Sequence, residues 1–266
     1  MQSQYSEAVI ASMTLIFGDG FLSPGGEDEV KRIIQSQTGG TNLAGRKVLD
    51  WGCGLGGTAL ALAQQCHADD VLGIDIEPGN IQLAEALVNR HGCSGQIAFQ
   101  LVEPGPMPLA ENFADVIFTK EALCHIADKA PVFADFHRVL RPGGGFIGSD
   151  WMTGSETTNS HAYRAWEDQL RSAGLSFTFT SMTAHRDGLE AAGFEQVEIT
   201  DDTAWTLEHG EGYVNRLEGP DRPRMLELLG EDGLAGLIVR CSARVDALRN
   251  GDLCRCHMHA RKPGPS

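Results

Sequence analysis

The stretch that decides the fold is residues 48–57, which read VLDWGCGLGG. It joins a short apolar run, ending in Asp50, to a glycine loop that is followed by good helix formers. A strand, a glycine loop and a helix in this order are typical of a nucleotide-binding βαβ unit. The glycines Gly52, Gly54 and Gly56 are spaced Gly-x-Gly-x-Gly, whereas the dinucleotide pattern is Gly-x-Gly-x-x-Gly. The loop can therefore pass close to an adenosine without cradling a pyrophosphate.

Beyond this loop, short apolar runs alternate with amphipathic stretches. Such alternation indicates repeated βαβ units and a parallel sheet. The expected fold class is therefore α/β, a Rossmann-like seven-stranded, mostly parallel sheet. Strands are predicted at residues 47–50, 71–76, 97–102, 114–119, 145–150, 194–200 and 253–260.

Segments outside this alternation predict an α-helical cap, contributed by the N-terminus and by late insertions. Residues 160–173 and 182–192 have helical sequences, and Ser181 suits the N-cap of the second helix. We expect these helices and the N-terminal segment to cover the carboxyl edge of the sheet. The predicted division is an N-terminal helical lid at 1–46, a core at 47–262 with cap insertions at about 151–193 and 201–252, and a tail at 263–266.

The composition is that of a globular protein, with 42% hydrophobic and 21% charged residues. A formal net charge of −15 disfavours a nucleic-acid partner, because binding to phosphates depends on clustered Lys and Arg. No apolar run reaches the roughly 18 residues of a membrane span, and the first residues lack the features of a signal peptide. The seven cysteines are scattered, as is typical of reduced thiols. We therefore expect a cytoplasmic protein without a membrane partner.

One cluster, Cys-Arg-Cys-His at 254–257, contains residue types that bind metals. Zinc sites usually combine two separated pairs of ligands, and no second pair is present. Cys256, His257 and His259 form a weaker candidate set, and we expect no metal site. The acidic run Glu-Asp-Glu at 27–29 is expected at a helix N-terminus, where it complements the helix dipole.

Asp75 ends the second predicted strand, where a carboxylate can hold both hydroxyls of a ribose. Together with this residue, four segments resemble the class I S-adenosylmethionine-dependent methyltransferases. They are VLDWGCGLGG (48–57), GIDI (73–76), ADVI (114–117) and RVLRPGG (138–144). The resemblance implies S-adenosyl-L-methionine as the cofactor and S-adenosyl-L-homocysteine as its product.

The same resemblance implies which residues hold the cofactor, with Asp75 on the ribose. Ile76, Val102 and Glu103 would flank the adenine. Asp50 would lie near the methionine amino group, and Lys120 is placed to meet the methionine carboxylate. The predicted cofactor residues are, in full, Leu22, Ser23, Asp50, Gly52, Cys53, Gly54, Asp75, Ile76, Val102, Glu103, Thr119 and Lys120.

Two segments outside the core, IFGDGFLSPGG (16–26) and KEALCH (120–125), resemble the small-amine N-methyltransferases of the phosphoethanolamine methyltransferase type. The sarcosine and dimethylglycine methyltransferases share the second segment and a long insertion before the last strand. In the first family, a Tyr thirteen residues before the glycine of the Phe-Gly pair interacts with a His after strand four. Here Tyr5 stands thirteen residues before Gly18, and His125 occupies the other position.

This resemblance implies a catalytic role for His125 and Tyr5. The chemistry of methyl transfer to nitrogen explains why such a role is needed. The sulfonium already activates the methyl group, so the enzyme has to align a lone pair and exclude water. A protonated amine has no lone pair, and histidine readily accepts a proton near neutral pH. Tyr5, on a mobile lid, would hydrogen-bond His125 and close the site. The alternative is that His125 only starts a helix and that Tyr5 is a surface aromatic residue.

The predicted acceptor site departs from the phosphoethanolamine pattern. A buried phosphate needs cationic or hydroxylated partners, but Leu175 and Phe177 stand where that family has Arg and Tyr. A phosphorylated acceptor is therefore not expected. The predicted substrate-binding residues are Trp151 and Phe177 as aromatic walls for a methylated ammonium, Glu121 as its counter-ion, and Arg244 for a carboxylate.

The prediction is methyl transfer from S-adenosylmethionine to a nitrogen of a small amine or amino acid, with a small amine or zwitterion as partner. One alternative is an O- or S-methyltransferase of a small carboxylate or thioether, and a thioether acceptor would need no base. A further alternative is a protein that binds S-adenosylmethionine without catalysis, which would have no use for the Tyr5 and His125 pair.

Overall fold

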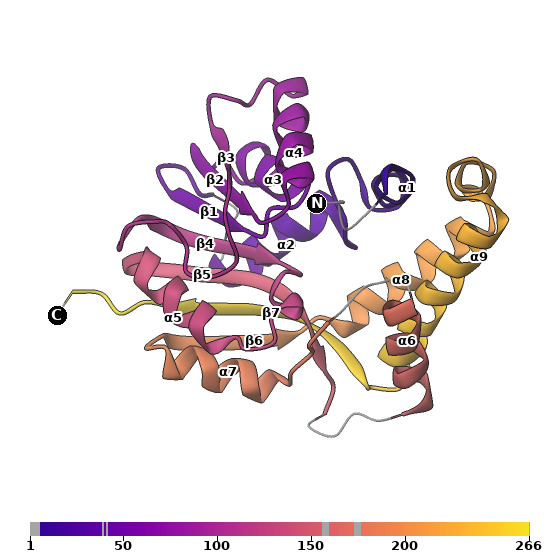
Figure 1. The fold of residues 1–266 in the computed structure, drawn as a ribbon. Helices are drawn as coiled ribbons and strands as arrows, with labels where there is room; N and C mark the ends of the chain where they lie inside the picture. Colours follow the sequence, from indigo (N-terminus) through magenta and orange to yellow (C-terminus); the bar gives the residue numbers. More distant parts are fainter. Residues whose placement is uncertain (1–5, 39, 41, 156–159, 173–176, 266) are drawn as a thin grey trace.

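The computed structural model describes residues 6–38, 40, 42–155, 160–172 and 177–265. A seven-stranded sheet lies at its centre, in the order β3-β2-β1-β4-β5-β7-β6 (Figure 1). Strand β7 runs antiparallel to β5 and β6, and the other paired strands are parallel. The predicted Rossmann-like sheet is thereby confirmed. The strands are β1 (Lys47–Trp51), β2 (Asp70–Asp75), β3 (Ile97–Leu101), β4 (Ala114–Lys120), β5 (Leu140–Thr153), β6 (Glu195–Asp201) and β7 (Leu253–Arg261).

Helices cover both faces of the sheet and enclose two apolar cores. Side chains alternate along a strand, so Val48 and Phe118 point into one core while Leu49 and Ile117 point into the other. The first core is covered by α2 (Gly26–Thr38), α3 (Gly57–Gln64) and α4 (Pro78–Arg90), and the second by α5 (Ala130–Val139) and α7 (Met182–Ala191).

Helix α7 is where the observed architecture differs from the predicted division. The helix begins as predicted, because the Ser181 side chain accepts a hydrogen bond from the backbone of Ala184. Its buried Leu189 then packs into the core of the sheet, beside α5. Of the helices in the stretch 151–193, only α6 (His161–Ser172) therefore lies in the cap.

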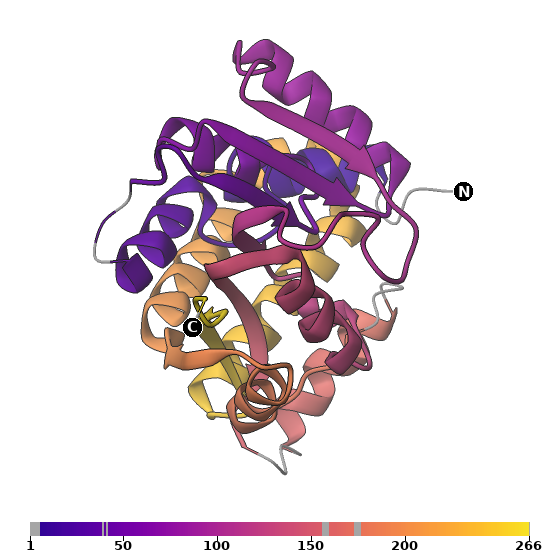
Figure 2. The ribbon, with the colours of Figure 1, turned by 90° about the vertical axis from the view of Figure 1, so that its left-hand side faces the viewer.

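The cap lies beyond the carboxyl ends of the parallel strands (Figure 1). Figure 2 looks at the opposite, amino-terminal edge of these strands, with α9 behind the sheet. Helix α9 packs against α1, α6 and α8, and it bends at Gly230, which has a φ of 70°. None of the described helices is both long enough and apolar enough to cross a membrane. The cap helices are α1 (Glu7–Phe17), α6, α8 (Thr203–Glu218) and α9 (Arg222–Arg249).

Candidate active site

A cavity of about 730 Å³ lies between the carboxyl ends of the strands and the cap. The loops after β1, β2, β3 and β4 line one side of it, and α1, α6 and α9 line the other. Ligands of open α/β sheets bind at this edge, where the strand order reverses beside β1 and β4. The predicted site residues that line the cavity are Leu22, Ser23, Gly52, Cys53, Gly54, Asp75, Ile76, Val102, Glu103, Lys120, Glu121, His125, Trp151, Phe177 and Arg244.

The loop after β1 is held in a conformation that requires glycine. Gly52 has a φ of 74°, and a Cβ atom at this position would lie 2.5 Å from the Cβ of Ala122. The Asp75 carboxylate accepts hydrogen bonds from the backbone nitrogens of Gly54 (2.8 Å) and Glu77 (2.9 Å). These contacts tie the glycine loop to the end of β2, with backbone atoms at the edge of the cavity.

The residues after β2 and β3 make this end of the cavity suitable for a nucleoside. Ile76 is 51% exposed, which is unusual for a large apolar side chain, and it lines the cavity together with Val102. The carboxylates of Asp75 and Glu103 belong to the same lining. A carboxylate has about four lone-pair positions, so Asp75 can accept ribose hydroxyls besides its two backbone N–H groups. The combination of glycine backbone, apolar surface and carboxylates fits an adenosine.

Lys120, at the end of β4, is engaged by the N-terminal segment. Its Nζ donates to Ser23 Oγ (2.6 Å) and to the Pro24 carbonyl (2.7 Å), and it lies 3.2 Å from Glu29 Oε2. Two hydrogen bonds and an ion pair thus already engage the ammonium within the protein. The contact predicted between Lys120 and a methionine carboxylate therefore does not match the arrangement, in which Lys120 links β4 to the segment before α2.

Asp50 and Thr119, two of the predicted cofactor residues, are buried and do not line the cavity. Burial, assisted by the charge of Asp75, raises the pKa of Asp50 to about 8. Thr119 donates its hydroxyl to the carbonyl of Trp51 (2.9 Å) and so joins β4 to β1. Contact of either side chain with a cofactor therefore stays a prediction.

The other end of the cavity contains a row of rings. His125, the last residue of the short helix η1 (Leu123–His125), has its ring centroid 4.6 Å from that of Phe177. Phe177 stacks on Phe179 with centroids 5.5 Å apart, and Phe179 stacks on Trp166 at 5.2 Å. The predicted base and one predicted wall therefore lie side by side. Tyr5, the predicted partner of His125, lies outside the described residues.

Glu121 is already bound to groups of the protein. Its Oε2 accepts a hydrogen bond from Trp151 Nε1 (2.8 Å), while its Oε1 pairs with Arg255 and lies 3.6 Å from Lys120 Nζ. The φ of Glu121 is 56°, a value that is uncommon outside glycine and that recurs at functional sites. Glu121 thus orients the Trp151 ring, and these contacts do not match its predicted role as the counter-ion of an amine.

Two guanidinium groups from α9 line the same end of the cavity. Arg240 and Arg244 are one helical turn apart, and neither pairs with a carboxylate among the described residues. The Cζ atom of Arg244 lies 5.5 Å from the centroid of a Trp151 ring. Its Nη2 is buried, and no described residue accepts a hydrogen bond from it. An anion in the cavity would supply the missing acceptor.

A buried network of charges around Arg255 lies next to this end of the cavity. Arg255 and Glu29 are completely buried, and Arg255 Nη2 lies 2.7 Å from Glu29 Oε1. Burial alone would raise the pKa of Glu29, but the charges of Arg255 and Lys120 outweigh it and hold this pKa well below its usual range. With His257 as the link to Asp202, the described residues of the network are Glu29, Glu121, Asp202, Arg32, Lys120, Arg255 and His257.

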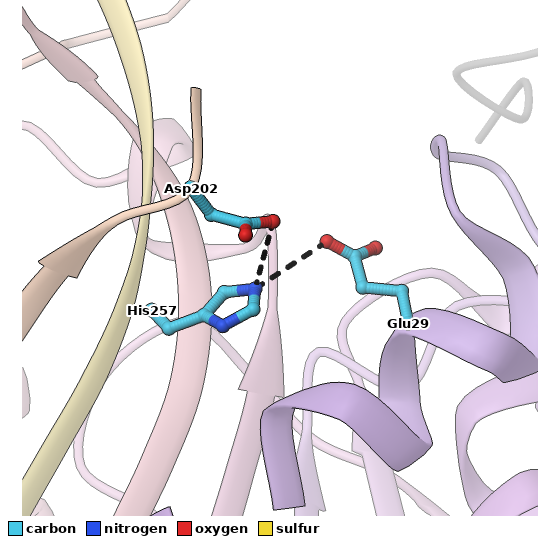
Figure 3. A group of neighbouring side chains, drawn as sticks. All are labelled: Glu29, Asp202 and His257. Carbon is cyan, nitrogen blue, oxygen red and sulfur yellow. Dashed lines mark ion pairs between the residues drawn. The ribbon is translucent and has the colours of Figure 1, made fainter. Parts of the chain in front are cut away.

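Figure 3 shows three side chains at the edge of this network, Glu29, Asp202 and His257. Their potential ligand atoms lie within 4.8 Å of one another, and His257 Nε2 is 3.4 Å from Asp202 Oδ2. The two carboxylates already pair with Arg255 and Arg32, so a metal ion would have to displace two guanidinium groups. The contacts are therefore those of ion pairs within the protein.

The cluster Cys254–His257 divides between the two faces of β7. Cys254 and Cys256 pack into the second core of the sheet with their Sγ atoms 3.6 Å apart. Arg255 and His257 point to the opposite face, toward the charge network. Cys256 and His257 therefore cannot share a ligand, and all seven cysteines are free and buried.

Three residues of this region were not predicted from the sequence. Glu29 lies in the first turn of α2 as expected for the acidic run, yet its exposure is 0% and its partners are buried cations. Arg255 could have been suspected, because it is a charged residue between two cysteines of a predicted strand. Arg240 could have been suspected from its position one turn before Arg244.

Comparison with known proteins gives matches along most of the chain. Phosphoethanolamine N-methyltransferase 1 of Triticum aestivum is 31% identical over 200 residues, which cover 75% of this chain and 38% of that protein. The enzyme of the same name from Arabidopsis thaliana is 29% identical over 247 residues, covering 90% of this chain and 48% of that protein. The chain thus spans less than half the length of these relatives.

Solved structures share the fold. Phosphoethanolamine N-methyltransferase 2 of Haemonchus contortus, bound to phosphomonomethylethanolamine and S-adenosylhomocysteine, superposes with a TM-score of 0.87 at 22% identity. The match covers 98% of this chain and 58% of that one. A candidate sarcosine dimethylglycine methyltransferase of Galdieria sulphuraria has a TM-score of 0.74 at 20% identity, with 90% of this chain and 85% of that one covered.

The methyltransferase domain family matches residues 42–203, which include the glycine loop, Asp75 and strands β1 to β6. This match spans more than half of the chain and agrees with the sheet order and the position of the cavity. The protein therefore belongs to the methyltransferase domain family, with the class I fold that its sequence predicts.

Proposed function

We propose that this chain transfers a methyl group from S-adenosylmethionine to the nitrogen of a small amine that also carries an anionic group. One observation carries the proposal: a single cavity joins an end suited to an adenosine to an end that holds His125 and Arg244, whose buried Nη2 finds no hydrogen-bond acceptor among the described residues. Nitrogen as the methyl acceptor is supported by relatives named phosphoethanolamine N-methyltransferases.

The residues of the nucleoside end would hold the cofactor. The glycine loop would pass beneath it, Asp75 would accept the ribose hydroxyls, and Ile76 and Val102 would enclose the adenine beside Glu103. When bound, S-adenosylmethionine supplies a methyl group on a positively charged sulfur, which needs no further activation. The chain's own task is therefore to orient the acceptor and to keep water out.

His125 would take the proton of the acceptor amine. The freed lone pair then forms the new N–C bond as the S–C bond breaks, and the proton remains on the imidazole. Phe177 packs against the His125 ring and limits its rotation. Residues 1–46 would form a lid, anchored by the contacts of Lys120 with Ser23 and Pro24.

The test measures release of S-adenosylhomocysteine with glycine, sarcosine, dimethylglycine and phosphoethanolamine. Replacement of the base in His125→Ala should lower kcat by roughly 10²–10⁴-fold while cofactor affinity stays unchanged. His91→Ala, at an exposed position outside the cavity, is the matched control. Full activity of His125→Ala would exclude a base and favour a thioether acceptor. Cofactor binding without turnover of any amine, acid or thioether would identify a binding protein.

A further inference from the structure

We propose that the acceptor has an apolar body, and that its class is amino acids with an apolar side chain, rather than glycine derivatives or phosphoethanolamine. The inference rests on the proposed function and concerns the half of the cavity that faces α6 and α9. Two features carry it: the pair Arg240 and Arg244, and the way in which the aromatic rings are stacked.

The arginine pair requires an anionic group on the acceptor. Three cationic side chains line the cavity among the described residues, and Lys120 is bound to Glu29 and to the loop before α2. Arg240 and Arg244 have no carboxylate partner among those residues, and Arg244 Nη2 is buried without an acceptor. A carboxylate matches the planar fork of a guanidinium and would satisfy this nitrogen.

The aromatic rings of this half stack on one another, which leaves less ring face for a methylated ammonium than a cage would offer. Cations bind the faces of aromatic rings, where the quadrupole is negative. Phe179 has ring neighbours at 5.5 Å and 5.2 Å, and Phe177 has them at 5.5 Å and 4.6 Å. Part of the surface of both rings is therefore covered by neighbouring rings.

Trp151 is likewise engaged by protein cations. The Cζ atoms of Arg244 and Arg255 lie 5.5 Å and 5.1 Å from centroids of its rings, and its indole N–H is bound to Glu121. The Trp151 ring thus already contacts two guanidinium groups, which leaves less of its face for the ammonium of a substrate.

Several apolar side chains also line the cavity. Met13, Leu170, Leu237 and Cys241 are among them and come from three different helices. A glycine derivative would leave this surface in contact with water, whereas an apolar side chain would cover it. The amine itself would bind in its neutral form after losing a proton to His125, so no carboxylate is needed beside it.

The experiment compares phenylalanine with compounds that each lack one of its features. Phenethylamine lacks the carboxylate, and 3-phenylpropionate lacks the amine. Glycine lacks the apolar side chain. Phosphoethanolamine has a phosphate ester in place of both the apolar side chain and the carboxylate. We expect kcat/KM for phenylalanine to exceed the values for the other four by about tenfold or more. A preference for glycine or phosphoethanolamine would overturn the inference but keep the proposed N-methylation. Ester formation from 3-phenylpropionate, or no turnover of any compound, would instead overturn the proposed function.

Variants of Arg240 and Arg244 test whether these two side chains bind the carboxylate of the acceptor. Arg244→Met and Arg240→Met should each lower the phenylalanine to phenethylamine ratio of kcat/KM, mainly by raising KM for phenylalanine. Arg249→Met removes a guanidinium from the same helix at an exposed position that pairs with Glu211, and it should leave the ratio unchanged. An unchanged ratio in both Arg244→Met and Arg240→Met would overturn the inference, even if phenylalanine is the preferred acceptor.

Discussion

At the scale of single residues, Gly52 has the least freedom in the loop that borders the cavity. Any side chain there would have to share space with Ala122 at a positive φ. We expect Gly52→Ala to weaken S-adenosylmethionine binding by about tenfold or more, measured by calorimetry, because the loop has to move. Gly92→Ala is the matched control, since Gly92 has a φ of 69° but no atom within 4 Å of its Cβ position. It should lose only about 1–2 kcal/mol of stability, and normal binding by Gly52→Ala would contradict the expectation.

Asp50 makes stability depend on pH. Its pKa of about 8 in the folded chain exceeds the value of about 4 expected after unfolding, and burial likewise raises the pKa of Asp150 to about 7. The folded state therefore binds these protons more tightly, and the stability they contribute below pH 4 is lost as the pH rises through 7 to 8. Asp50→Asn should lose less stability between pH 6 and pH 9 than the wild type in urea unfolding. Asp115→Asn is the control, because the pKa of Asp115 is lowered, and an unchanged slope for Asp50→Asn would refute the assignment.

At the scale of elements, much of the sheet could be predicted because β1 to β4 are short, mostly apolar runs between turn signals. Ser181 and the acidic run at 27–29 likewise marked helix starts correctly. The assignment of α7 to the cap failed because amphipathic helices look alike in sequence whether they pack on a sheet or on other helices. Only the contact of Leu189 with the second core distinguishes the two cases.

A buried lysine, Lys120, links β4 to the segment before α2. Lys120→Met removes the bonds to Ser23 and Pro24, so we expect faster hydrogen exchange in residues 16–26 and weaker cofactor binding. Lys31→Met is the control, since Lys31 pairs only with exposed Asp28 at the surface of α2. Equal exchange in both variants would show that Lys120 does not anchor this segment.

At the scale of the whole molecule, the network around Arg255 connects α2, the end of β4, the loop before α8 and β7. Arg255→Met would leave Glu29 and Glu121 buried beside fewer cations, and we expect a loss of about 3–5 kcal/mol in the free energy of unfolding. The double variant Glu29→Gln with Arg255→Met should recover part of this loss, because one uncompensated charge is removed. Chemical denaturation measures both, and a loss below about 1 kcal/mol for Arg255→Met would mean that the network contributes little.

The sequence predicts only those parts of the candidate site whose residues lie within a single motif. The glycine loop and His125 follow a strand and Asp75 ends one, so their local sequence places them at the carboxyl edge. The charge network could not be predicted, because residues 29, 121, 202 and 255 meet only after the sheet has formed. Glu121 illustrates this limit. It was correctly placed at the site, but its negative charge is paired with an arginine from a strand that is distant in the sequence.

The position of β7 has a consequence for biosynthesis. Strand β6 cannot join the sheet until β7 lies between it and β5, and β7 is made about fifty residues later than β6. During translation, β6 and one edge of β5 therefore have no strand to pair with until β7 is made. Over the same period, Glu29 and Glu121 lack the Arg255 guanidinium that neutralises them. Completion of the sheet and neutralisation of these carboxylates then occur in one event, when residues 253–261 leave the ribosome. A ribosome-bound chain that ends before residue 253 should be far more sensitive to protease than the released protein.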